Sequence, residues 1–401
     1  MTDTFIFDAV RTPRGKGHNK GALYEVKPID LLAALLRALN QRHHFPTSEI
    51  NDLLIGCVNP IDDQGSNIAK AALLYAGWDQ QVSGVQINRQ EAAGLEAINL
   101  AAMKIATGMD QLVVAGGIEC MSRIPRGSDG GPLNYDSELL NTINYIPQGV
   151  AADLLATLEN FDRATLDDFA LRSYQRAIKA QENGHFDKTL IPVFDRNGLT
   201  VLEKEEYLEE PIDEENLKQL PPAFLEAGLL GYDEMALHRY PEVEHIHHLH
   251  TQASTAKPAD GAALLLLGNE AKGKSLGLQP RAKIRSSAVV SVDPTLMLSG
   301  PTLAAQKALK LAGMKPKDIQ LWECNEDFAV IPLKLKADFN LDVSALNPNG
   351  GALALGNPLG ASGAMLLAAL LDEMERGEHS TGLTTIATGG GMAVATIIEK
   401  I

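Results

Sequence analysis

The sequence predicts an α/β fold made of two similar halves, and three observations support this prediction. Short apolar strands alternate with helical segments near both ends of the chain, as in layered α/β proteins. A turn of small residues, a helix, a strand and a group of glycines follow in the same order in residues 92–117 and 360–391. Residues 364–371 are apolar all round, as in a helix buried between two sheets. Together these features predict a five-layer αβαβα sandwich.

The individual elements follow from hydrophobic periodicity. Leucines repeat at helical spacing in residues 28–39, and short apolar runs bounded by turn residues indicate strands. The expected elements of the first half are strands at residues 4–10, 52–58, 82–87 and 111–115, with helices at residues 28–39 and 67–77. An apolar run at residues 262–267 predicts a strand that returns to this half, and residues 383–387 form a late strand of the second half.

A region of different composition, residues 121–250, separates the halves. Glycine, proline and acidic residues increase there, strands are rare, and helical pieces such as residues 165–183 look exposed. We interpret this region as an inserted loop domain that covers one face of the α/β layers. The predicted domains are residues 1–120 with 251–271 for the N-terminal half, residues 121–250 for the insertion, and residues 272–401 for the C-terminal half.

The insertion ends in a tract of four histidines, His245, His247, His248 and His250. Histidine-rich tracts are able to bind metals. In an extended segment, however, the first two would face one way and the last two the other. No cysteine or carboxylate at suitable spacing completes a ligand set. We therefore predict no metal site.

The charge and cysteine content exclude several classes of protein. The 401 residues include 51 acidic and 35 basic side chains, and the net charge of −16 disfavours nucleic acids and anionic membranes as partners. The three cysteines, Cys57, Cys120 and Cys324, are far apart, which fits a reducing compartment. No apolar run is long enough for a membrane span. We therefore expect a cytoplasmic protein.

The chain is organised around one stretch, residues 87–100, which reads INRQEAAGLEAINL. A strand-like run enters it, a helix leaves it, and small residues form a tight turn between them. Such a turn lifts one side chain and the neighbouring backbone N–H groups into a pocket at the helix N-terminus. The side chain placed there is Glu91.

Five motifs along the chain carry a family resemblance. They are DAVRTPRGKG at residues 8–17, GCVNPIDDQGSNIA at 56–69, VVAGGIECMSR at 113–123, NPNGGALALGNPLGASGA at 347–364 and GGGM at 389–392. Together they resemble the thiolase superfamily, specifically the 3-ketoacyl-CoA and acetyl-CoA acyltransferases. The resemblance implies two thiolase halves, a loop domain that binds coenzyme A (CoA), and a homodimer or homotetramer. It implies no permanently bound cofactor, with CoA or an acyl-CoA as the expected ligand.

The residues at the thiolase catalytic positions differ from the family pattern. The resemblance aligns Glu91 with the nucleophilic cysteine, Asn357 with the histidine that activates it, and Ala387 with the second cysteine, which acts as acid and base. The family motif N-E-A-F-A keeps its first residue as Asn325 and gains a carboxylate at Asp327. All three reactive groups of the family are therefore replaced.

The resemblance also implies binding positions. The backbone N–H groups of Glu91 and Gly389 align with one oxyanion hole, and Asn357 beside Asn325 aligns with the other. Ser254, Thr255 and Ala256 align with the stretch that lines the pantetheine tunnel and are predicted to contact the substrate. Their sequence departs from the family's G-N-x-S-G pattern, so ordinary CoA placement does not follow from it.

A carboxylate is a poor acyl carrier, because it would form a mixed anhydride with no histidine to assist. Losing three groups that act as a unit removes most of the rate, so we predict no ordinary thiolysis or Claisen condensation. The first hypothesis is an inactive thiolase homologue that binds an acyl-CoA or a partner, such as an active thiolase or another subunit of fatty-acid metabolism. The second is decarboxylation, retro-aldol cleavage or hydrolysis of a CoA thioester with Glu91 as general base. The third is a weak acetyl-CoA C-acyltransferase.

Access to Glu91 distinguishes the first two hypotheses. A general base must face an open tunnel. A carboxylate that plugs the vacant oxyanion hole would instead accept the N–H groups of Glu91 and Gly389, at a helix N-terminus that favours its charge. For the third hypothesis Cys324 is a conceivable nucleophile, but we expect a buried, inert thiol at that position.

Overall fold

The structure is a computed structural model that describes residues 2–209 and 214–401. Apart from β6 and β7, which pair with each other in a separate sheet, its other ten strands form one mixed sheet in the order β10-β11-β12-β9-β1-β8-β5-β3-β4, with β2 paired to β8 at the side. Their bounds are β1 (Thr4–Arg11), β2 (Gly15–Lys16), β3 (Asp52–Gly56), β4 (Ser83–Ile87), β5 (Leu112–Cys120), β8 (Ala259–Gly268), β9 (Ala282–Ser291), β10 (Leu321–Cys324), β11 (Thr381–Ala387) and β12 (Met392–Lys400). The strands expected from the sequence are therefore present, β5 and β8 being longer than expected.

The strands of the two halves join edge to edge. β1 pairs antiparallel with β9 over three residue pairs, from Thr4 with Ile284 to Ile6 with Ala282. β8, which follows the inserted region, pairs antiparallel with both β1 and β5. The returning strand predicted from residues 262–267 therefore lies at the centre of the first half.

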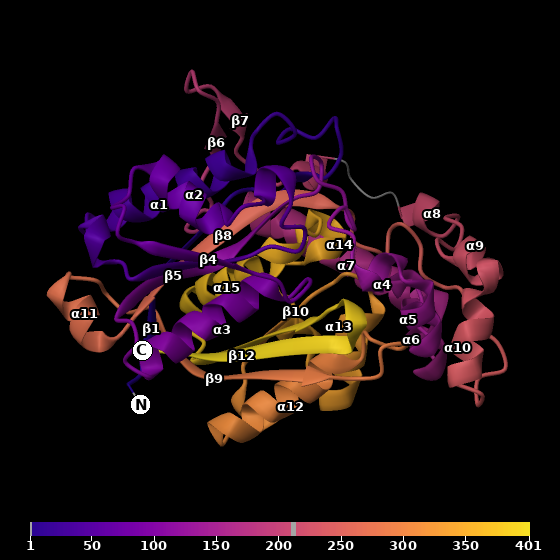
Figure 1. Cartoon of the computed structure of the whole chain (residues 1–401). Coiled ribbons are helices and arrows are strands. Elements are labelled where there is room, and N and C mark those ends of the chain that lie inside the picture. Colours follow the sequence, from indigo (N-terminus) through magenta and orange to yellow (C-terminus); the bar gives the residue numbers. More distant parts are fainter. Residues whose placement is uncertain (1, 210–213) are drawn as a thin grey trace.

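Helices complete five layers, which confirms the predicted α/β sandwich (Figure 1). α1 and α2 cover the outer face of the N-terminal strands, α3 and α15 lie between the two sets of strands, and α12 and α13 cover the C-terminal strands. The bounds are α1 (Pro28–His43), α2 (Ile68–Ala76), α3 (Ala93–Ala106), α11 (Glu270–Ser275), α12 (Gly300–Ala312), α13 (Val330–Phe339), α14 (Ala352–Leu355) and α15 (Leu359–Arg376). Three large hydrophobic clusters fill the spaces between these layers.

The central helices α3 and α15 approach each other closely at their N-terminal ends. A Cβ atom on Gly94 would lie 2.5 Å from the carbonyl oxygen of Gly360, so no larger residue fits there. Nearly all of α15 is buried, as its apolar sequence predicts. The two similar halves therefore bring their helix N-termini to one place, where the candidate site lies.

The inserted region carries most of the remaining elements. They are α4 (Pro132–Tyr135), α5 (Ser137–Thr142), α6 (Gln148–Leu158), α7 (Arg163–Glu182), β6 (Val193–Phe194), β7 (Thr200–Leu202), α8 (Glu214–Leu217), α9 (Leu225–Ala227), a π-helical turn (Gly228–Tyr232) and α10 (Asp233–Arg239). The expectation that residues 165–183 are exposed was wrong. Leu166, Phe169 and Tyr174 of α7 are buried, since they recur at helical spacing with small residues between them.

A membrane-spanning helix was not expected from the sequence. Across residues 2–209 and 214–401, no helix combines the length and the apolar character needed to cross a bilayer.

Candidate active site

The turn before α3 has the strained geometry that its sequence predicts. Gln90 adopts a left-handed backbone conformation with φ of 50°, which is uncommon for a residue other than glycine. Its N–H donates to Oδ1 of Asn88 at 2.8 Å, which stabilises the turn. Helix α3 then begins at Ala93. This geometry directs Glu91 inward at the helix N-terminus, and its side chain is only 2% exposed.

Three donors hold the Glu91 carboxylate. Nη2 of Arg126 donates to Oε1 at 2.7 Å, and Nε2 of Gln148 donates to the same oxygen at 3.0 Å. The backbone N–H of Gly389 donates to Oε2 at 2.9 Å. The sequence predicted that the backbone N–H groups of Glu91 and Gly389 would bind this carboxylate. In the structure the N–H of Gly389 does so. Both oxygens of Glu91 are engaged within the protein.

Asn325 and Ala387 form a second closed arrangement beside this one. The amide of Asn325 accepts from the N–H of Ala387 at 2.9 Å and donates to the carbonyl oxygen of Ala387 at 3.2 Å. This pairing holds the end of β11 directly before Gly389. The role of Asn325 beside Asn357 in an oxyanion hole stays a prediction, and the structure adds the contact of the Asn325 amide with the backbone of Ala387.

A cavity of about 290 Å³ opens next to these residues. Its apolar wall contains aromatic, aliphatic and small side chains, and its polar wall contains three charged residues. The lining residues are Met121, Gly149, Phe224, Ala256, Pro258, Phe328 and Leu359, with Arg126, Gln148, Thr255, Lys257, Asp327 and Asn357. We call it the Asp327 cavity. A small cavity with mostly apolar walls and a few polar groups is typical of a ligand site.

The segment after the histidine tract forms one wall of the Asp327 cavity. Ala256 donates its N–H to the carbonyl oxygen of Asp327 at 2.9 Å, and Asn357 donates its N–H to that of Lys257 at 2.8 Å. Thr255 and Ala256, which the resemblance predicts to contact the substrate, line this cavity. Ser254 does not line this cavity. Its buried hydroxyl accepts from the N–H of Thr251 at 2.9 Å, because a short polar side chain can close a local turn.

A chain of side-chain hydrogen bonds ends at Asp327. The hydroxyl of Ser362 donates to Oδ1 of Asn357, and Nδ2 of Asn357 donates to Oδ1 of Asp327 at 2.8 Å. Burial and the negative charge of Glu91 raise the pKa of Asp327 to about 7, against the opposing effects of Asn325 and Arg126. Asp327 is therefore the carboxyl group in this cavity that changes its charge near neutral pH.

The Glu91–Arg126 ion pair lies between two hollows of the protein. Arg126 lines the Asp327 cavity and also a second hollow of about 220 Å³ whose wall includes Gln90, Tyr145 and Gly389. Glu91 lines neither of them. The carboxylate at the nucleophile position is thus enclosed between the two spaces and faces no open tunnel among the described residues.

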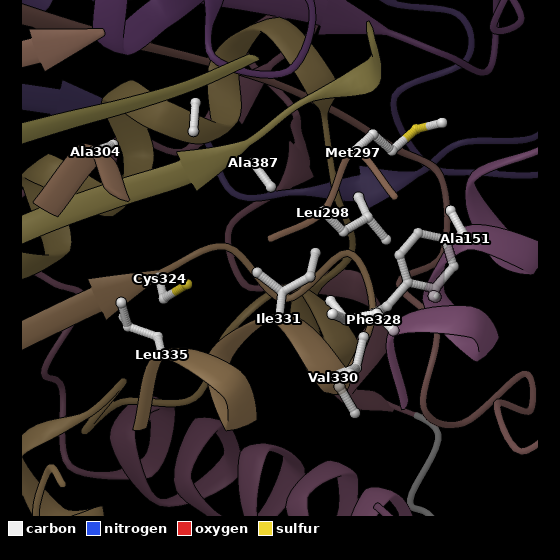
Figure 2. Packing of buried hydrophobic residues seen from close by; sticks show 14 of the residues in the cluster. Ala151, Met297, Leu298, Ala304, Cys324, Phe328, Val330, Ile331, Leu335 and Ala387 are labelled. Atoms are coloured by element: carbon white, nitrogen blue, oxygen red, sulfur yellow. The ribbon is translucent and has the colours of Figure 1, made fainter. Parts of the chain in front are cut away.

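The three cysteines are enclosed in the protein interior. Cys57, Cys120 and Cys324 are buried and line none of the hollows described above. Figure 2 shows Cys324 and Ala387 among the apolar side chains of the largest cluster, together with Ile331 and Leu335. Burial raises the pKa of all three thiols, so the thiolate is disfavoured. Cys324 thus has the surroundings of an inert core thiol.

The histidine tract is organised around a carboxylate. Asp153 on α6 is fully buried and accepts from Nδ1 of His248 at 2.9 Å and Nδ1 of His250 at 2.7 Å. The hydrogen bond to Asp153 raises the pKa of His248 to about 9, with a second contribution from Asp233. Within residues 2–209 and 214–401, no cluster of three or more histidine, cysteine or acidic side chains is arranged to hold a metal ion. The tract therefore anchors the end of the insertion to α6.

Comparisons with known proteins identify the family. Models of the family described as "Thiolase, N-terminal domain" and "Thiolase, C-terminal domain" match residues 4–231 and 278–400. The chain is 36% identical to a 3-ketoacyl-CoA thiolase of Yersinia enterocolitica, with 100% of both chains covered. It is 34% identical to a steroid 3-ketoacyl-CoA thiolase of Mycobacterium tuberculosis, over 100% of this chain and 95% of that one.

A solved structure agrees with these relatives. The crystal structure of the Bacillus anthracis acetyl-CoA acetyltransferase superimposes with a TM-score of 0.86 at 32% identity, covering 100% of this chain and 99% of that one. The matches extend over both halves and the insertion. The chain therefore belongs to the thiolase family.

Two partners of Glu91 were missed from the sequence. Arg126 and Gln148 lie 35 and 57 residues after Glu91 in a region that shows no motif for anion binding. The sequence did contain one signal, because a carboxylate introduced into a buried turn requires a compensating donor. It did not contain the identity of that donor.

Proposed function

We propose that this protein binds a CoA thioester in the Asp327 cavity and does not carry an acyl group on a side chain. The observation behind this proposal is the arrangement of Glu91. Its two oxygens are bound by Arg126, Gln148 and the N–H of Gly389, and its side chain is enclosed. A group held in this way by a cation and a backbone donor stabilises the turn and fills the space of an oxyanion.

The ligand class is supported by the cavity and by the relatives. Thr255 and Ala256 line the cavity at the positions that resemble the pantetheine tunnel. The relatives are named as 3-ketoacyl-CoA thiolases and an acetyl-CoA acetyltransferase, so CoA thioesters are the class of ligand to test first. No permanently bound cofactor is needed for such binding.

A weak acetyl-CoA C-acyltransferase is the second candidate, because the names of the relatives favour it. Such an enzyme would need a nucleophile. The three buried cysteines are not among the residues that line the Asp327 cavity. The hypothesis that Glu91 acts as a general base has less support, since Glu91 does not line the cavity either.

We also propose that the protein is a homodimer or homotetramer in the cytoplasm. In the described parts of the chain, β4 pairs with β3 along one side and has no strand on the other. Such an edge is available to a second copy of the chain. Light scattering after gel filtration tests this, and a monomer at micromolar concentration would contradict it. An active thiolase is the alternative partner that we propose for the same surface.

Calorimetric titration with acetyl-CoA tests the binding proposal. Ala256→Trp places a large side chain in the cavity wall and should weaken binding by about tenfold or more. Met109→Trp is the matched control, because Met109 is 73% exposed and lies outside the cavity. Equal affinity in both variants, or no binding by the unaltered protein, would contradict the proposal.

A further inference from the structure

Asp327 is the carboxyl group of the Asp327 cavity that no aligned thiolase role explains. Its side chain lines the cavity, and its Oδ1 accepts from Asn357 at 2.8 Å. It also lies within the electrostatic influence of Glu91 and Arg126. Glu91 is tied to internal donors, whereas Asp327 faces the space where a ligand would bind.

We propose that Asp327 removes and returns a proton on the α-carbon of a CoA thioester bound in this cavity, a proton-transfer activity in which no acyl-enzyme forms. This inference rests on the proposed binding of a CoA thioester. In this proposal the general base is Asp327 of the altered N-E-D-F-A motif, and not Glu91 at the nucleophile position.

Asn357 supplies the second group that this chemistry needs. Its Oδ1 accepts from Ser362, so its amide nitrogen points towards Asp327. Among the described residues, Nδ2 of Asn357 donates to Asp327 alone, and a side-chain amide carries two N–H bonds. The second N–H is therefore available in a cavity that Asn357 itself lines. A donor there stabilises negative charge that develops on a thioester oxygen.

The surrounding charges suit an acid–base group at neutral pH. Glu91 from the turn before α3 opposes ionisation of Asp327, and Arg126 from the loop after β5 favours it. Lys257 on the cavity wall lies over the ring of Tyr207, 5.1 Å from its centre. The amides of Asn325 and Asn357 are neutral. A base whose pKa lies near the working pH is effective in proton transfer.

The step is balanced without any further reactant. The ionised carboxylate of Asp327 takes the α-proton, the C–H electron pair forms a carbon–carbon double bond, and the thioester oxygen gains the negative charge. Return of a proton from Asp327 to the same carbon restores the thioester. In deuterium oxide the proton on the Asp327 carboxyl group exchanges with solvent deuterium. Each reprotonation of the α-carbon can therefore add a deuterium atom to the thioester.

The test is α-hydrogen exchange of butanoyl-CoA in deuterium oxide, read by mass spectrometry, with binding measured in parallel by calorimetry. We expect exchange at about tenfold or more over buffer, rising as the pH increases through about 7. Asp327→Asn should bind butanoyl-CoA and exchange it at the buffer rate. Asp327→Glu should restore part of the exchange, and Asp342→Asn, at an exposed turn, should exchange like the unaltered protein.

Glu91→Gln separates the two carboxylates. Removing the negative charge of Glu91 lowers the pKa of Asp327, so the pH midpoint of exchange should move to lower pH. Loss of exchange at every pH in Glu91→Gln, with butanoyl-CoA still bound, would make Glu91 the base and overturn the inference. Binding without exchange in the unaltered protein would overturn the inference and leave the proposed function standing. Absence of binding would overturn both.

Discussion

Two carboxylates in the candidate site, Glu91 and Asp327, have opposite surroundings. Glu91 accepts from a guanidinium, a side-chain amide and a backbone N–H, and it is enclosed. Asp327 accepts from the amide of Asn357, lies close enough to Glu91 to be affected by its charge, and lines a cavity. The same functional group is therefore tied to three donors in a closed space at one position and lines a cavity at the other.

The difference shows that alignment with a catalytic position does not decide which group is reactive. The carboxylate at the nucleophile position is bound by donors that would otherwise stabilise an oxyanion. Its charge instead raises the pKa of Asp327. Asp327 is not one of the three positions that align with catalytic residues of the family. The number of hydrogen-bond donors around each carboxylate and its access to a cavity, rather than its position in the alignment, distinguish a structural carboxylate from one suited to proton transfer.

The largest expected effect on stability is that of Asp327→Asn at pH 8. Burial and the charge of Glu91 raise the pKa of Asp327 from 3.8 to about 7, so the contribution of this group to stability is present at low pH and is lost as the pH rises through about 7. The neutral amide avoids that loss. We expect the variant to be more stable by about 2–4 kcal/mol at pH 8.

Urea unfolding at pH 8 and at pH 5 measures this effect. At pH 5 the carboxyl group is protonated in the folded state but already ionised in the unfolded state, so the advantage of the variant should be smaller there than at pH 8 by about 2–3 kcal/mol. If Asp327→Asn were less stable than the unaltered protein at pH 8, ionisation of Asp327 would not lower the free energy of unfolding, and the prediction would be wrong.

A smaller effect is expected from Arg126→Ala, which removes the cation from Glu91. The Arg126 side chain is 49% exposed, so water replaces part of its contribution. We expect a loss of about 1–2 kcal/mol at pH 8, because the enclosed carboxylate loses its counter-charge. Urea unfolding at fixed pH measures it.

Arg123→Ala is the matched control for this prediction. Arg123 lies in the same loop and pairs with Asp63, whose side chain is 43% exposed. The loss there should stay below about 1 kcal/mol. Equal losses in the two variants would mean that the enclosure of Glu91 makes no energetic difference.

The smallest effect is expected from Gln148→Ala. Gln148 gives Glu91 a neutral hydrogen bond at 3.0 Å, and two donors remain when it is removed. We expect a loss of about 1 kcal/mol at pH 8 in the same unfolding assay. A loss larger than that of Arg126→Ala would contradict the order of donors proposed for this carboxylate.

Much of the fold followed from the sequence because its signals are local. The leucine spacing that predicts α1, the apolar residues of α15 and the tight turn before α3 each depend on neighbouring residues alone. The edge-to-edge join of β1 and β9 did not follow, since strand pairing over such separations has no local signal. The buried face of α7 was missed because small residues such as Ala170, Ser173 and Ala177 make up much of it and give a weak apolar signal.

The candidate site was predicted only in part. Gly389 donates to Glu91, and Asn357, Thr255 and Ala256 line the Asp327 cavity, whereas their roles toward a substrate stay predictions. The altered pKa of Asp327 depends on burial and on a residue far away in the chain, so no motif predicts it. The side chain of Ser254 contacts the backbone three residues away, and that of Asn325 contacts the backbone of Ala387, 62 residues away, so the second contact is visible only in three dimensions.

One measurement tests the central claim, that Glu91 closes the nucleophile position to acyl transfer. Purified protein is incubated with acetoacetyl-CoA and with a longer 3-ketoacyl-CoA, with and without free CoA, and the products are read by mass spectrometry. We expect no CoA-dependent shortening of either substrate, because loss of the groups that act together removes nearly all of the rate. A shortened acyl-CoA that appears only when CoA is added, and that persists in Glu91→Ala, would contradict the claim and require a nucleophile elsewhere, beginning with Cys324.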